Sequence, residues 1–164
     1  MFKVDATDLR WLENMDEQND LCLHGKAVAI IGDETLEYDA TVSSTALYLL
    51  KSLTENHVIY HDNPMLPCCG HSMYANEKLN NVDIVGCSNG IDWSITHTSE
   101  GIEVVTDAGN KTVIGLEDYK KNVYSFVDMI EDYYNKSLPK TLPDDKVDRD
   151  GYIAFWNEWR RRRL

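Results

Sequence analysis

The chain has 164 residues and a formal net charge of −12, with 28 Asp and Glu against 16 Lys and Arg. This length is typical of one domain, and the 43% of hydrophobic residues supplies a core and excludes a disordered chain. The negative field repels nucleic acid and anionic membranes, so we exclude both as main partners and expect attraction to basic proteins.

The first third of the chain is predicted to form a short helix, a hairpin and a longer helix. Residues 8–15 carry apolar side chains at helical spacing. Residues 21–38 contain Val- and Ile-rich runs on either side of a glycine-containing turn, which is typical of a hairpin. From Val42 to Leu53 the apolar positions gather on one face of a helix of about three turns.

The middle of the chain changes from an irregular loop to short strands. Residues 57–81 lose periodicity and contain Pro64, Pro67 and Gly70, so we expect a long loop of the kind that is commonly functional or mobile. From 82 to 114, β-prone runs alternate with turn residues, which predicts an antiparallel meander. Alternating apolar and polar residues predict that one face of this sheet is buried.

Two helices are predicted to end the chain. Residues 117–135 carry a broad apolar stripe, and a proline-containing connector at 137–147 leads to a last helix that begins after Asp148. We expect the aromatic face of this helix to pack on its own domain, with docking on another molecule as the alternative. The sequence therefore predicts a single α+β domain over residues 1–164, an antiparallel meander packed on one face by amphipathic helices.

The amino end and the cysteines bear on the compartment. Charged residues stand where a signal peptide has its apolar stretch, and no aliphatic run is long enough to span a bilayer. We therefore expect a cytoplasmic protein with no membrane span. In that compartment the cysteines are expected to be reduced thiols or metal ligands rather than two disulfides. They are Cys22, Cys68, Cys69 and Cys87.

A Cys/His-rich region at 61–97 is a candidate for zinc or thiol chemistry. Zinc prefers four nitrogen or sulfur ligands, and a glycine-containing turn can present two of them. The candidate ligands are Cys68, His71, Cys87 and His97, with His61 as an alternative to His97. Two other interpretations stay open. Cys68 or Cys69 can be a nucleophile activated by His71, or the cysteines can be buried and inert.

The usual sequence motifs of hydrolases, nucleotide-binding proteins and zinc proteases are absent, which weakens an enzymatic interpretation. Carboxylates instead offer a candidate surface for the lysines and arginines of a partner. The candidate residues are Glu34, Glu37 and Asp39 in the hairpin, and Asp128, Glu131 and Asp132 on the helix at 117–135. The alternative is that these charges form an ordinary solvated surface that only keeps the protein soluble.

Three stretches of the chain resemble a family of small bacterial proteins of unassigned function. They are Leu66–His71, Gly86–Trp93 and Asp148–Arg160. The resemblance spans about residues 45–163 and carries no functional residues with it. In size and acidity the chain is similar to immunity proteins, which neutralise a cognate toxin. We therefore expect a non-enzymatic, cofactor-free binding protein whose acidic face blocks a basic active site, with a zinc-binding or thiol-dependent enzyme as the alternative.

Overall fold

The computed structural model describes residues 1–68 and 72–164, and these form three helices and ten strands. The strands are β1 (Phe2–Arg10), β2 (His24–Ile31), β3 (Glu34–Ala40), β4 (Leu66–Pro67), β5 (Ser72–Ala75), β6 (Val82–Val85), β7 (Gly90–Ile91), β8 (Trp93–Thr98), β9 (Gly101–Thr106) and β10 (Lys111–Ile114). The helices are α1 (Val42–Ser52), α2 (Leu116–Lys136) and α3 (Lys146–Arg162). The predicted α+β class is confirmed.

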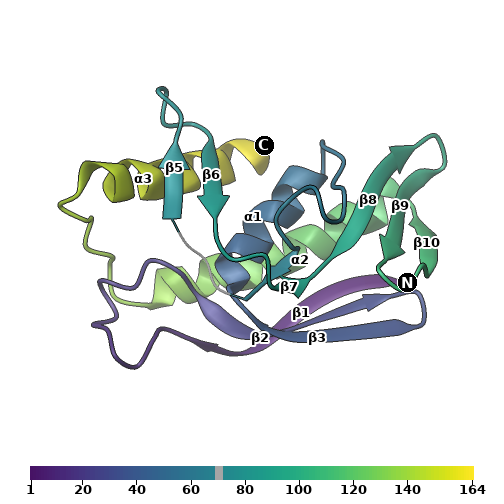
Figure 1. Ribbon diagram of the computed structural model, residues 1–164, viewed down its shortest axis with the longest axis horizontal. Helices are drawn as coiled ribbons and strands as arrows, with labels where there is room; N and C mark the ends of the chain where they lie inside the picture. Colours follow the sequence, from purple (N-terminus) through teal and green to yellow (C-terminus); the bar gives the residue numbers. More distant parts are fainter. Residues whose placement is uncertain (69–71) are drawn as a thin grey trace.

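Four small antiparallel sheets surround the helices within the described residues. Their strand orders are β1-β2-β3, β10-β9-β8, β4-β7 and β5-β6. Figure 1 shows β1-β2-β3 along the lower side of the molecule, α1 and α2 above it, β8-β9-β10 at the right, and β5, β6 and α3 at the other end. The core lies between these layers and includes large aromatic rings that are fully buried. They are Trp93, Tyr119, Phe126, Phe155 and Trp159.

The helix predicted at residues 8–15 is wrong, because the chain begins with the long strand β1. Phe2, Val4 and Ala6 are buried and alternate with more exposed neighbours, so the period is that of a strand. β1 pairs with β2, and the register shifts between Thr7 and Arg10. The apolar spacing beyond residue 8 resembles that of a helix by chance. It comes from this bulge and from the irregular connection after it.

Most of the other predicted elements are correct, but two strands pair differently from the prediction. The hairpin of β2 and β3, the helices α1 and α2, and the β8-β9-β10 meander are confirmed. Val82–Val85 does not join that meander, because it pairs with β5, inside the region predicted to be a loop. The two-residue strand β7 pairs with β4 instead of extending β8, so the meander begins later than predicted.

The last helix packs on its own domain, as predicted. Its neighbour there is β5. The helix begins at Lys146 rather than after Asp148, because the side chain of Asp145 accepts hydrogen bonds from the amides of the first turn. Gly151 lets α3 approach β5 closely, since a β-carbon there would lie 2.0 Å from the carbonyl oxygen of Met73. Among the described residues, no helix is both long and apolar enough to cross a membrane.

A buried carboxylate holds α3 in place. Glu158 is 1% exposed. Its Oε2 accepts a hydrogen bond of 2.7 Å from the amide of Val82, and its Oε1 accepts one of 2.8 Å from Arg162 Nε. Lys51 Nζ of α1 lies 3.7 Å from the same Oε1. A buried charge is tolerated when it is paired and hydrogen-bonded, and this one joins α3 to β6 and α1.

We predict that Gly151→Ala lowers the free energy of unfolding by at least about 2 kcal/mol, because the added methyl group forces α3 away from β5. At an ordinary helix position, replacing glycine by alanine stabilises the helix. A loss of stability at this position therefore identifies the close contact. Urea denaturation measures it. Gly115→Ala is the control, with a change below about 1 kcal/mol, since its β-carbon would meet no atom closer than 4.0 Å. A neutral or stabilising Gly151→Ala would contradict the packing.

We predict that Glu158→Ala destabilises the protein by about 3 to 5 kcal/mol, because it leaves the Val82 amide and the partly buried Arg162 without their acceptor. Asp128→Ala removes a carboxylate that is 59% exposed and pairs with Arg163, so it should change stability by less than about 1 kcal/mol. Denaturant midpoints of the two variants give the comparison. Equal losses would show that Glu158 is not a special anchor.

Candidate functional site

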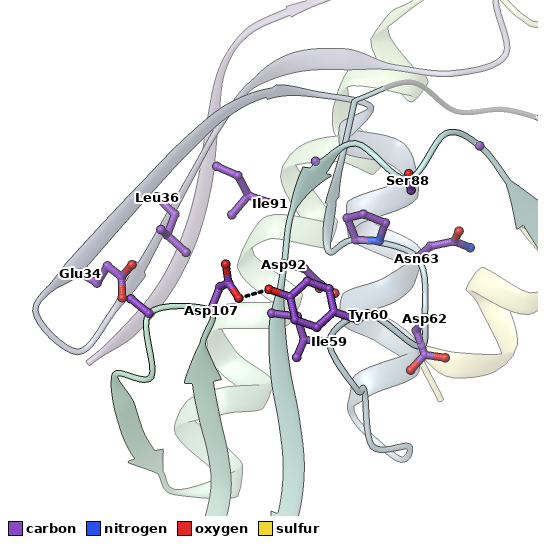
Figure 2. A pocket seen from close by; sticks show the side chains of 14 residues that line it. Glu34, Leu36, Ile59, Tyr60, Asp62, Asn63, Ser88, Ile91, Asp92 and Asp107 are labelled. Atoms are coloured by element: carbon purple, nitrogen blue, oxygen red, sulfur yellow. Dashed lines mark hydrogen bonds between the residues drawn. The ribbon is translucent and has the colours of Figure 1, made fainter.

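A cleft of about 600 Å³ opens between β3, the loop at 59–64, the segment at 86–92 and the turn after β9 (Figure 2). Its carboxylates are Glu34, Asp62, Asp92 and Asp107. Its apolar lining consists of Leu36, Ile59, Pro64, Ile91 and Ala108. Concave sites that combine apolar walls with a few polar groups are typical of binding sites.

Glu34 is fixed at the β3 side of the cleft. Its Oε2 accepts hydrogen bonds of 2.6 Å from Thr106 Oγ1 and from Asn110 Nδ2, at the end of β9 and in the turn that follows. These hydrogen bonds, first that of Asn110 and then that of Thr106, hold the pKa of Glu34 below its usual value. The carboxylate is therefore ionised at neutral pH.

Tyr60 and Asp107 meet across the cleft. Tyr60 is 78% exposed and has a positive φ of 68°. Its hydroxyl donates a hydrogen bond to Asp107 Oδ1, which Figure 2 shows as a dashed line, and this bond raises the pKa of Tyr60. The hydrogen bond joins the loop at 59–64 to the turn after β9. An exposed aromatic ring is thereby positioned beside the carboxylate of Asp107.

Asp92 fixes the inner end of the cleft. Its Oδ1 lies 2.7 Å from His57 Nε2 and accepts hydrogen bonds from the amides of Met65 and Trp93. The main chain of His57 also pairs with Ile95 of β8. This carboxylate is 11% exposed, so it is mainly a structural anchor.

Asp62 is the exposed acid of the loop at 59–64. Its side chain is 52% exposed, and its Oδ2 accepts a hydrogen bond of 2.9 Å from the amide of Val58. The same oxygen is 3.8 Å from His57 Nδ1. The loop thereby presents a carboxylate to solvent while its first turn is closed by the same group.

The charge in the cleft is not balanced by its walls. The described residues that line it include no lysine or arginine. A cleft lined by one sign of charge concentrates the field and attracts ions of the other sign. Aliphatic walls beside the carboxylates also suit the stem of a lysine or arginine side chain. The arrangement can therefore hold a cationic side chain, with the head group at the acids and the stem on Leu36 and Ile91.

The acids predicted as a partner surface are mostly engaged elsewhere. Asp39 forms two hydrogen bonds of 2.8 Å with Arg10. On α2, Asp128 and Glu131 pair with Arg163, and Asp132 pairs with Lys136. The exposed Glu37 lies on β3, outside the cleft lining.

Of the six, the structure brings only Glu34 into the cleft, within the described lining. β3 is one edge of its sheet, whereas α2 contacts β1 at the other edge, so the two predicted groups do not form one surface. Sequence reasoning missed Asp62, Asp92 and Asp107. Asp107 could have been found as a carboxylate directly after a β-prone run, whereas Asp92 lies inside such a run and has no comparable signal.

The structure corrects the expectation of reduced thiols for two of the four cysteines, because Cys68 and Cys87 form a disulfide across 19 residues of sequence, whereas Cys22 is free and Cys69 lies outside the described residues. Of the other two members of the predicted zinc set, only His97 lies within the described residues. His97 Nε2 lies 2.9 Å from the carbonyl oxygen of Ser52, and His71 is outside the described residues. In the part of the chain that is described, no three His, Cys, Asp or Glu side chains converge as metal ligands.

The zinc and thiol hypotheses stay predictions. The thiol hypothesis pairs Cys68 or Cys69 with His71 as the activating base. Cys69 and His71 lie outside the described residues. The disulfide occupies the sulfur atoms of Cys68 and Cys87, so neither is a thiolate in this form. Zinc binding at these two positions would require reduction first.

Comparisons with known proteins supply no relative. The sequence matches no family model and no curated protein, and the fold matches no solved structure. The resemblance to small acidic bacterial proteins therefore stays a prediction. Function has to be argued from the geometry of the site.

Cys22 is a partly buried free cysteine, and desolvation, with a contribution from Asp20, raises its pKa to about 12. Only the thiolate is alkylated, so we predict that iodoacetamide modifies Cys22 in the folded protein at pH 8 about a thousandfold more slowly than in urea. Between pH 8 and pH 10 the rate in the folded protein should rise about tenfold per pH unit. Peptide mass spectrometry measures both rates. Equal rates at pH 8 would contradict the burial of the thiol.

Proposed function

We propose that this protein is a non-enzymatic binding module that captures a basic segment of another protein in the acidic cleft. We further propose that it acts as an immunity or antitoxin-like inhibitor, in which the captured segment belongs to a basic active site. The observation that carries the proposal is the cleft lining, which combines four carboxylates with apolar side chains and, among the described residues, no lysine or arginine.

The chemistry of the lining supports a lysine or arginine side chain as the group that is bound. Charge-assisted hydrogen bonds to carboxylates are shorter and stronger than neutral ones, and arginine can bind a carboxylate through two parallel bonds. Glu34 and Asp107 offer such acceptors, and the exposed ring of Tyr60 offers a face for a cation–π contact. The negative net charge of −12 favours rapid encounter with a basic partner.

The cleft is a better candidate than the acidic face of α2. A partner cation at α2 would have to displace Arg163 from Asp128 and Glu131, or Lys136 from Asp132. A cation entering the cleft displaces no lysine or arginine from the described lining. The interaction gained in the cleft is therefore offset by fewer lost ion pairs.

We place this activity in the cytoplasm, as the sequence leads us to expect. The cytoplasm keeps most thiols reduced, and disulfides found there are usually transient or redox-sensing. The Cys68–Cys87 bond would then form and break under cellular control. Its place beside the cleft makes that chemistry relevant to binding.

We predict that an acetylated and amidated hexa-arginine peptide binds the protein and that the triple variant Glu34→Gln, Asp62→Asn, Asp107→Asn weakens this binding at least about tenfold. Each substitution keeps a hydrogen-bond acceptor and removes one negative charge. Asp92 is left unchanged because it anchors three segments. Isothermal titration calorimetry at low and physiological salt measures the dissociation constants, and hexaglutamate is the negative peptide control.

The matched control is Asp128→Asn, Glu131→Gln, Asp132→Asn, which removes three charges from α2. It should weaken binding less than about threefold, because the cleft is intact and only the long-range field changes. Equal losses in the two triple variants would show that the peptide responds to net charge rather than to the cleft. Absence of hexa-arginine binding at low salt would overturn the proposed function.

A further inference from the structure

The wall of the cleft at residues 86–89 is a connection between strands. It links β6 to β7, and its Gly86 and Ser88 line the cleft. Cys87 lies between these two residues and is bonded to Cys68. A hydrogen bond of 3.1 Å from the amide of Cys68 to the carbonyl oxygen of Asn89 runs beside the disulfide. The disulfide therefore ties the middle of the cleft wall to the end of β4.

The strand pairing beside this wall is short. β4 and β7 pair through two residues each, with Leu66 opposite Ile91 and Pro67 opposite Gly90. Proline has no amide hydrogen to donate to this pairing. Gly90 has a positive φ of 150° and lies so close to β4 that a β-carbon would be 2.4 Å from the carbonyl oxygen of Leu66. Because this pairing covers only two residues, the disulfide adds an important covalent restraint to the wall.

The disulfide is placed where a reductant can reach it. Cys68 and Cys87 are both partly buried, and Gly86 and Ser88 on either side of Cys87 are exposed. Accessible disulfides are the ones that exchange with thiols, whereas deeply buried ones are structural. Cys22, with its raised pKa, is a poor competitor in such exchange.

We infer that the Cys68–Cys87 disulfide is a redox switch that sets the affinity of the acidic cleft for its basic partner, an inference that rests on the proposed function. A dithiol reductant supplies the two electrons. One of its thiolates attacks a sulfur of the Cys68–Cys87 bond and forms a mixed disulfide, and its second thiol then displaces the protein sulfur. The products are two protein thiols and the oxidised, cyclic form of the reductant.

Reduction weakens binding because it releases the cleft wall. With the bond broken, the contacts that still hold residues 86–89 include the short β4-β7 pairing and the Asn89 hydrogen bond, and the segment has one covalent restraint fewer, so it samples more conformations. The apparent affinity of a site falls by the fraction of molecules that hold the competent geometry. The oxidised form is therefore the high-affinity form.

The test compares the oxidised protein with the same protein reduced by dithiothreitol. Hydrogen exchange followed by mass spectrometry measures protection of peptides that cover residues 84–92, and calorimetry measures the dissociation constant of hexa-arginine. We expect reduction to speed exchange in this segment and to weaken binding at least about tenfold. Exchange in β1 and β2 should be unchanged, which shows that the reduced protein is still folded.

Three variants separate the cysteines. Cys87→Ser should behave as the reduced form in both redox conditions. Cys22→Ser is the matched control and should keep the full redox response. Cys69→Ser should also keep it, because the bond joins Cys68 to Cys87. Should Cys87→Ser fail to fold, the dithiothreitol comparison on the natural chain decides the matter.

The outcomes distinguish the two proposals. Hexa-arginine binding that is equally tight in both redox forms overturns the switch and leaves the proposed function standing. No binding in either form overturns the proposed function and, with it, the switch, whatever hydrogen exchange shows. Loss of the redox response in Cys69→Ser overturns the assignment of the bond to Cys68 and Cys87.

Discussion

One carboxylate oxygen, Asp92 Oδ1, joins three segments at one end of the cleft. It contacts the ring of His57 in the loop after α1, accepts the amide of Met65 before β4, and accepts the amide of Trp93 at the start of β8. Trp93 follows directly and is fully buried. The polar anchor and one of the two fully buried tryptophans are thus neighbours in sequence, so the position of the cleft is tied to the packing of the core.

The opposite end of the molecule depends on a different pair of contacts. Glu158 joins α3 to β6 and α1, and Gly151 lets the helix rest on the backbone of β5. β6 then runs directly into the segment at 86–89 that forms the cleft wall. The docking of α3 therefore fixes where this wall begins, while Asp92 fixes what lies beyond it. The disulfide of Cys87 stands between these two supports.

The excess of acidic residues has to be considered together with where the acids lie and which groups they contact. On α2 and at the edge of β3, carboxylates are paired with arginine or lysine of the same chain, and exposed pairs of this kind contribute little to stability. In the cleft, the acids are held by hydroxyl, amide and imidazole groups, which position a carboxylate without an arginine or lysine partner. Local pairing, rather than total charge, therefore distinguishes the cleft from the acidic surface of α2.

By itself the sequence determined the α+β class, the β2–β3 hairpin, the β8-β9-β10 meander and the helices, because these depend on local periodicity and turn residues. Only the tertiary structure decided that β5 pairs with β6, that α1 is buried on nearly all sides including Ser43 and Thr45, and that residues 8–15 do not form a helix. The cleft belongs to the second group. Its acids come from β3, a loop and two strand ends, and no spacing along the chain encodes contacts that are made across sheets.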